Sequence, residues 1–144
     1  MTVTDALAKA ELFRDLSTQS LARVAALSES QSLEEGDAVY TLGDDAEHLY
    51  VLTEGRVRFS LGVGNRPKGS GSIIEPISVF GWAALLEDQP RRLATATCLE
   101  DSRVLAISGP ALLQAFESDQ AAGFRVMRRL ATMITRDFLY DMSV

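Results

Sequence analysis

The chain has 144 residues and a formal net charge of −6, with 14 Lys and Arg against 20 Asp and Glu. A hydrophobic content of 47% with 24% charged residues is typical of a globular protein, and this length is typical of one domain. The acidic balance argues against a surface built mainly to bind nucleic acid or an anionic membrane, since both need basic patches. We therefore expect a single domain over residues 1–144.

The lone cysteine and the lone histidine restrict the chemistry. Cys98 cannot form an internal disulfide, and a site of four thiolates is excluded. His48 alone cannot supply a metal site of two or three histidines, so we expect no metal, no cofactor and no enzymatic activity. A cupin-type barrel enzyme is an alternative that a stoichiometric bound metal would revive. No signal peptide and no apolar stretch of about 20 residues is present, which predicts a cytoplasmic, non-membrane protein.

Residues 4–30 are predicted to form two short N-terminal helices, because their apolar residues recur at helical spacing and Ser17 is a good N-cap for the second. Residues 31–108 are predicted to form strands, because glycine and aspartate turns separate short β-rich runs. The predicted strands lie at residues 38–41, 49–53, 56–60, 94–98 and 103–107. The fold class is therefore mainly β with flanking helices: a β-roll or double-stranded β-helix, similar to a jelly roll.

Residues 109–141 are predicted to form C-terminal helices, a short one and then a long one over residues 120–140. The long helix carries two apolar stripes. Val126, Leu130 and Met133 form one stripe, and one of the two can pack on the roll. The other would be exposed in a monomer, which predicts a homodimer; the alternative is one wide stripe on a broad internal face. The stripe assigned to the dimer interface consists of Phe124, Met127, Ala131, Ile134 and Phe138.

The segment at residues 79–96 carries the strongest indication of a binding site. Gly81 allows the backbone to approach a ligand closely, and a short helical turn follows at residues 83–86. The N–H groups that open such a turn lack helical partners and favour an anion. Two arginines follow a proline, and an arginine that faces inward could bind a phosphate or carboxylate through two parallel hydrogen bonds. Arginines in such a place are also typical of plain surface charge.

Several separate motifs occur in a recognisable order. They lie at residues 12–17, Gly36, residues 43–44, 49–52 and 54–57, and residues 80–96. Together they resemble the cyclic-nucleotide-binding domain of the catabolite-activator and fumarate-nitrate regulator (Crp/Fnr) superfamily. The resemblance implies a regulatory, small-molecule-sensing domain in signal transduction, with cyclic AMP or cyclic GMP as the candidate ligand and a protein effector as a possible partner. Regulators of this family carry a helix-turn-helix after the long helix. This chain stops at Val144, so direct contact with nucleic acid is not expected of it.

The resemblance also implies roles for particular residues. The amides of Gly81, Ala83 and Ala84 would hold the cyclic phosphate. Arg92 precedes the matching Leu-Ala-Thr pattern and would bind the phosphate, whereas counting from the proline selects Arg91. Only one of the two can face inward on a strand. The expected ligand-binding residues are Gly81, Trp82, Ala83, Ala84, Arg91, Arg92 and Leu93.

Two departures from the family pattern bear on the ligand. Trp82 replaces the glutamate that accepts a hydrogen bond from the ribose hydroxyl, and an indole can only donate. Leu93 stands where a small hydroxyl residue often helps to hold the phosphate. An alternative interpretation is therefore an interaction or dimerisation module that binds no ligand because Trp82 fills the pocket. Arg92 could likewise be structural and pair with a carboxylate of the roll such as Glu54.

Overall fold

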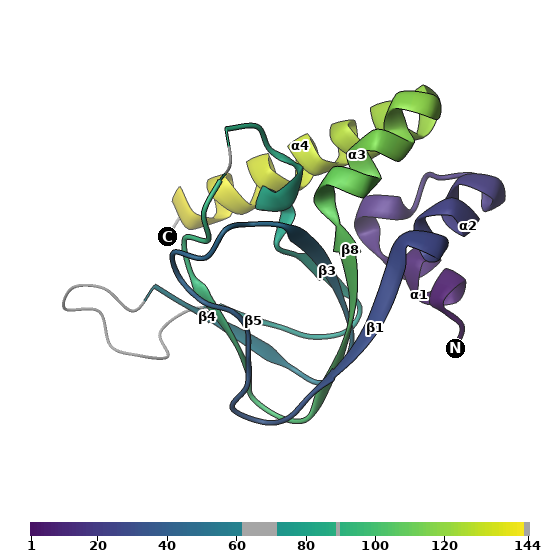
Figure 1. Ribbon diagram of the computed structural model, residues 1–144. Coiled ribbons are helices and arrows are strands. Elements are labelled where there is room, and N and C mark those ends of the chain that lie inside the picture. The colour runs from purple at the N-terminus through teal and green to yellow at the C-terminus, as the bar shows by residue number, and fades with distance from the viewer. Residues whose placement is uncertain (62–71, 89, 143–144) are drawn as a thin grey trace.

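The structure is a computed structural model that describes residues 1–61, 72–88 and 90–142. Within these residues, two antiparallel sheets of four strands face each other as a β-roll, and the helices lie along one side of the roll (Figure 1). The predicted class, a mainly β roll with N-terminal helices and a long C-terminal helix, is confirmed.

The N-terminal segment forms α1 (Val3–Lys9), a 3-10 turn, η1 (Glu11–Phe13), and α2 (Thr18–Leu27). The predicted N-cap is confirmed, because the Ser17 hydroxyl accepts a hydrogen bond from the Ser20 amide at 3.1 Å. The chain turns after α1, so the apolar residues of η1 enter the core from a 3-10 turn and not from a continuing α-helix.

The boundary between the helices and the roll was predicted at residue 31, and this is wrong by three residues. Strand β1 (Ser28–Leu33) begins directly after α2. Its central residues are exposed and polar, so neither apolar alternation nor β-propensity marks it as a strand. Its backbone is ordered by pairing with β8 (Ser102–Ser108), with Ser28 opposite Ile107. Pairing with a buried neighbour therefore overrides the local sequence.

The two sheets have the strand orders β1-β8-β3-β6 and β2-β7-β4-β5. All neighbouring strands pair in antiparallel fashion. Each predicted strand is present with its ends within one residue of the prediction, which is the usual uncertainty of a strand end. The remaining strands are β2 (Ala38–Tyr40), β3 (His48–Glu54), β4 (Val57–Ser60), β5 (Ile73–Ile74), β6 (Ser78–Phe80) and β7 (Thr95–Cys98).

Strand alternation divides the apolar residues between two cores. In β3, Leu49 and Val51 pack against the helices, whereas Tyr50 and Leu52 face the inside of the roll. Strand β8 alternates in the same way. These strands are covered on both faces, which explains why their sequences are almost continuously apolar. The sheet that contains them is a wall between the helical core and the interior of the roll.

The C-terminal helices are α3 (Gly109–Ser118) and α4 (Gln120–Met142). Both were predicted, and α4 extends two residues past the predicted end at residue 140. The stripe formed by Val126, Leu130 and Met133 is buried in the helical core. This stripe is the one that attaches α4 to its own domain.

The second stripe of α4 is only partly used within the chain. Met127 and Ile134 are half-buried against the helical core, so part of the stripe does serve the internal face. Phe124 is 66% exposed and Ala131 is exposed. The side chain of Phe138 lies outside the described residues. The proposed dimer interface is therefore carried, among the described side chains, mainly by Phe124.

Asp119 joins three helices at the corner between α3 and α4. One carboxylate oxygen accepts a hydrogen bond from the Ala122 amide at 3.3 Å and caps the start of α4. The other accepts from the Ser20 hydroxyl at 2.6 Å and from Arg23 at 3.3 Å, both on α2. The bond from Ser20 is the main reason that the pKa of Asp119 lies below its ordinary value of 3.8.

We expect the stability lost in Asp119→Asn to depend on pH. A carboxyl group whose pKa is lowered by folding stabilises the folded state above its ordinary pKa, and this contribution is lost as the pH falls through the lowered value. Asp119→Asn should therefore be less stable than wild type at pH 7, and the gap should narrow below about pH 4. Urea denaturation of both proteins at pH 7 and pH 3 measures the gap. An equal gap at both pH values would show that the charge of Asp119 contributes nothing.

Candidate ligand-binding site

The two adjacent arginines point in opposite directions. The side chain of Arg91 is 70% exposed, donates to the Gly43 carbonyl at 3.1 Å and lies 3.6 Å from the Asp45 carboxylate. Arg92 is only 4% exposed and points into the roll. Its backbone is fixed by the turn opposite, because its amide donates to the Asp44 carbonyl at 2.8 Å and its carbonyl accepts from the Gly43 amide at 2.9 Å. Geometry thus selects Arg92 as the inward arginine.

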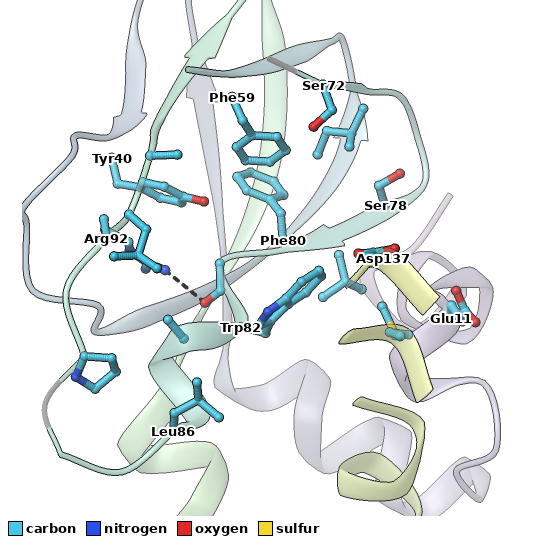
Figure 2. A pocket seen from close by; sticks show the side chains of 18 of the residues that line it. Glu11, Tyr40, Phe59, Ser72, Ser78, Phe80, Trp82, Leu86, Arg92 and Asp137 are labelled. Carbon is cyan, nitrogen blue, oxygen red and sulfur yellow. Dashed lines mark hydrogen bonds between the residues drawn. The ribbon is translucent and has the colours of Figure 1, made fainter. Parts of the chain in front are cut away.

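The buried guanidinium of Arg92 has no acidic partner. It donates to the carbonyls of Gly81, at 3.0 Å, and His48, and its central carbon lies 4.1 Å from the centroid of the Tyr40 ring (Figure 2). Its Nε is buried and has no hydrogen-bond partner. Among the described residues, no carboxylate lies within ion-pair distance, so the expected alternative of a pair with Glu54 is wrong.

The pKa values of Arg92 and of the two nearby tyrosines show how burial affects the charges of this cluster. Burial lowers the pKa of Arg92 from its ordinary value. Burial also raises the pKa of Tyr40 to about 12 and raises the pKa of Tyr50, although the nearby guanidinium acts in the opposite direction. Both phenols therefore stay neutral and supply no negative charge to the guanidinium, which Asp44 stabilises only from a distance.

Gly81 shapes the turn beside this charge. It has a φ of 77°, in the left-handed region, and begins the 3-10 turn η2 (Trp82–Leu85). A Cβ at residue 81 would lie 3.1 Å from both Arg92 Nη1 and the Tyr50 ring, a tight approach that adds to the conformational preference for glycine. The predicted turn at residues 83–86 is present and begins one residue earlier.

The Ala84 amide is engaged within the turn. Its amide donates to the Gly81 carbonyl at 3.3 Å, and it does not line the cavity. Its carbonyl instead touches the start of α3, where a Cβ on Gly109 would lie 2.2 Å from the Ala84 oxygen. Gly109 in turn donates its amide to the Glu47 carbonyl at 2.9 Å. Of the three residues predicted to hold the phosphate through their amides, Gly81 and Ala83 line the cavity.

A cavity of about 1020 Å³ opens in front of Arg92. Its wall inside the roll is aromatic, with Tyr40, Phe59 and Phe80 close together (Figure 2). Strand alternation would have pointed to these rings, although they were not predicted as site residues. Leu93 also lines the cavity, but it is 80% exposed and lies at the rim.

Trp82 lines the cavity without filling it. Its indole is half-buried, packs against the helical core and points away from Arg92, toward the side where Glu11 and Asp137 lie (Figure 2). The space in front of the guanidinium is therefore not occupied by the indole. The predicted alternative of a pocket plugged by Trp82 does not match this orientation.

An ion pair between distant parts of the chain borders the cavity. Arg136 of α4 donates to both carboxylate oxygens of Glu11 in η1, at 2.9 and 2.7 Å. These bonds lower the pKa of Glu11 and raise the pKa of Arg136. Arg129 of α4 binds Asp15 at 2.8 Å nearby. No local pattern predicts these contacts, because the partners are more than 100 residues apart in sequence.

Two further features are absent from the described part of the chain. No three histidine, cysteine, aspartate or glutamate side chains there lie close enough together to hold a metal ion. None of the helices described has an apolar stretch long enough to cross a bilayer. The site is a cavity with an aromatic wall inside the roll, polar and ionised side chains elsewhere on its lining, and the buried guanidinium of Arg92.

Comparison with known proteins assigns the fold to a family. A model of the cyclic nucleotide-binding domain matches residues 30–119, more than half of the chain. The chain belongs to this family. The match includes strands β2 to β8, most of β1, the turn η2 and Arg92, and it confirms the resemblance noted from the sequence motifs. The protein therefore has the fold of a cyclic nucleotide-binding regulatory domain.

Individual relatives of this domain agree with the assignment. Over 103 residues, or 72% of the chain, it is 28% identical to a protein of Rhodopseudomonas palustris named as a candidate potassium channel, and it spans only 24% of that protein. A candidate cyclic nucleotide-binding protein of Geobacter metallireducens has the same fold, with 24% identity, 94% and 98% of the two chains covered and a TM-score of 0.79. The regulatory domain of Toxoplasma gondii PKA, solved with cAMP, has 23% identity, 78% and 42% coverage and a TM-score of 0.65.

Proposed function

We propose that this domain senses an anionic small molecule, with cyclic AMP or cyclic GMP as the candidate ligand and Arg92 as the residue that binds its phosphate. The observation that carries the proposal is the buried guanidinium of Arg92, which borders a large cavity, has no carboxylate partner and retains an unused donor at Nε. Membership of the cyclic nucleotide-binding family supports the ligand class, as does the cAMP in the Toxoplasma relative.

The free-energy cost of burying a cation without a counter-charge supports a ligand-binding role for Arg92 over a purely structural one. Removing a cation from water costs several kcal/mol unless an opposite charge compensates it. Two carbonyls and an aromatic ring compensate only part of this cost. A phosphate in the cavity would supply the missing charge and could accept from the guanidinium in bidentate fashion. A buried charge that a protein retains without a partner is typical of a functional site.

The alternative function, an interaction module that binds no small molecule, receives less support. It requires Trp82 to fill the pocket, whereas the indole points away from Arg92 and a cavity of about 1020 Å³ lies beside it.

We also infer that the domain forms a homodimer through the second stripe of α4. Phe124 is a large apolar residue that is 66% exposed, and it continues the stripe of Met127 and Ile134. Exposed apolar surface on a long helix is typical of a protein contact. A second copy of the helix offers the same stripe, as a twofold interface requires.

Calorimetry with cyclic AMP and cyclic GMP, together with the fluorescence of Trp82, tests the proposed ligand site. Trp82 is the only tryptophan and lines the cavity, so ligand binding should change its emission. Arg92→Gln should weaken binding at least about tenfold, because a hydrogen bond to a charged group contributes about 1.5–3 kcal/mol. Arg91→Gln is the matched control and should bind like wild type, since the Arg91 side chain is largely exposed and is engaged with Gly43 and Asp45. Equal affinity of both variants would contradict the role of Arg92.

A further inference from the structure

A second hollow, separate from the cavity of Arg92, lies between α4 and the turn that follows η1. Its volume is about 430 Å³, which is enough for a few side chains of a partner. The residues that line it are Asp15, Phe124, Arg125, Arg128, Arg129 and Thr132. None of them lines the cavity in front of Arg92, so the function proposed above makes no use of this hollow.

Three arginines of α4 meet at the hollow because of their spacing. Arg125, Arg128 and Arg129 are three and four residues apart, so they lie on one face of the helix. The sequence from Gln120 to Arg136 contains no acidic residue, whereas the whole chain has a formal net charge of −6. The hollow is therefore a local basic area on an acidic protein.

Asp15 is the one carboxylate among the described residues that line the hollow, and it is already engaged. It accepts a hydrogen bond from Arg129 at 2.8 Å, and this bond is the main reason that the pKa of Asp15 lies below its ordinary value. The side chain of Arg129 is only 23% exposed and also lies 3.8 Å from the Glu11 carboxylate. Asp15 and Glu11 thus compensate the charge of Arg129 and leave the other two arginines of the hollow without a close counter-charge.

The guanidiniums of Arg125 and Arg128 keep donors for a ligand. Arg125 donates to the backbone carbonyl of Asp15 at 3.5 Å, which is a long hydrogen bond. Arg125 also lies near Asp119, but that carboxylate is held by two side chains of α2. Arg128 is exposed and takes part in none of the ion pairs between described residues. Both guanidiniums can therefore bind carboxylates in bidentate fashion.

The surroundings of the hollow favour a short acidic segment over an extended polyanion. Salt screens charges beyond about 8 Å at physiological ionic strength, so a short segment responds mainly to the arginines beside it. A nucleic acid or an anionic membrane would also lie against the acidic remainder of the chain. The exposed ring of Phe124 borders the hollow and offers apolar surface to a neighbouring side chain of a peptide.

We propose that this hollow is a docking site for an acidic segment of a partner protein, and that Arg125 and Arg128 bind two of its carboxylates. Clusters of arginines are a recurring means of recognising acidic motifs. Phe124 also belongs to the stripe assigned to the dimer, whereas both arginines lie off that stripe. The arginines are therefore the residues at which docking can be tested separately from the dimer.

Fluorescence anisotropy of a labelled peptide, in which glutamates flank a single leucine, tests the proposal on the full chain. Arg125→Gln/Arg128→Gln should weaken peptide binding at least about tenfold, because each lost guanidinium removes a hydrogen-bonded ion pair. Arg56→Gln/Arg103→Gln is the matched control, since it removes the same charge from exposed arginines of the roll. The control should change binding by less than about threefold. Circular dichroism checks that both double variants are folded.

The peptide and the two double variants also define the results that would overturn the proposal. A peptide with glutamine in place of every glutamate should not bind, and equal binding of the two peptides would contradict docking through carboxylates. Equal weakening in both double variants would show that only the net charge of the chain matters. Oligothymidylate that binds more tightly than the acidic peptide, and no longer binds Arg125→Gln/Arg128→Gln, would assign the hollow to nucleic acid instead. No binding of the acidic peptide at millimolar concentration would also overturn the proposal.

Calorimetry with cyclic AMP separates this result from the function proposed above. The affinity of Arg125→Gln/Arg128→Gln for cyclic AMP should equal that of wild type, because the hollow and the cavity of Arg92 share no lining residue. Loss of peptide binding with unchanged cyclic AMP binding would support two independent sites. Loss of both in the folded variant would overturn the assignment of a separate docking site.

Discussion

Arg92→Met is expected to abolish ligand binding while leaving the domain as stable as wild type or more stable. Methionine has a similar length and is apolar, so it removes the cost of burying a cation that has no acidic partner. Two hydrogen bonds are lost. The Gly81 carbonyl still accepts from the Ala84 amide, which limits the loss to about 1 kcal/mol for the carbonyl of His48. The saved desolvation is larger, so we expect a gain of about 0–2 kcal/mol.

Thermal and urea denaturation of Arg92→Met, beside calorimetry with cyclic AMP, checks both halves of this expectation. Arg91→Met is the control, because it removes the same charge from an exposed position and should change neither stability nor binding by much. A loss of more than about 2 kcal/mol in Arg92→Met alone would mean that the guanidinium holds the roll together. Such a result would support a structural role and weaken the ligand proposal.

Phe124→Glu is expected to convert a homodimer into a monomer. A glutamate in the centre of an apolar contact loses water without gaining a partner, and loss of an aromatic anchor at an interface costs about 2 kcal/mol or more. The dimer should therefore weaken at least about thirtyfold. The fold of the single chain should survive, because Phe124 is largely exposed. Sedimentation at several concentrations measures the association.

Thr132→Glu is the matched control for this experiment. Thr132 is exposed on α4 and is not part of the proposed stripe, although it borders the same hollow as Phe124, so the control tests whether a negative charge on this side of α4 is enough to weaken the dimer. Met127 and Ile134 are poorer choices because both also pack against the helical core, and their loss would destabilise the monomer. A wild-type chain that sediments as a monomer would exclude the dimer.

Five strands of the roll, β2, β3, β4, β7 and β8, could be predicted because their signals are local. Glycine and aspartate mark the turns, and the alternation within β4 depends only on adjacent residues. The buried strands β3 and β8 were equally clear as short apolar runs. The identity of Arg92 as the inward arginine needed one further fact, the register of its pairing with the turn at Gly43, which the sequence leaves uncertain by one residue.

The features that were missed depend on contacts between distant residues. Strand β1 is polar and is ordered by its neighbour β8. The ion pair of Glu11 with Arg136 joins two ends of the chain and has no local pattern. The direction of the Trp82 indole depends on how η2 packs against the helical core, so the sequence left open whether the ring fills the pocket. In each case the observed conformation depends on tertiary packing, because the local sequence permits more than one conformation.

The close approach of Gly109 to Ala84 has a consequence for how occupancy of the cavity could be transmitted. The first residue of α3 has no clearance from the turn that holds Gly81, and a single methyl group would not fit between them. A displacement of that turn toward α3 must therefore be accompanied by movement of α3, and α4 follows α3 after one residue. A ligand that pushes the turn in this direction is therefore expected to move the two C-terminal helices as well.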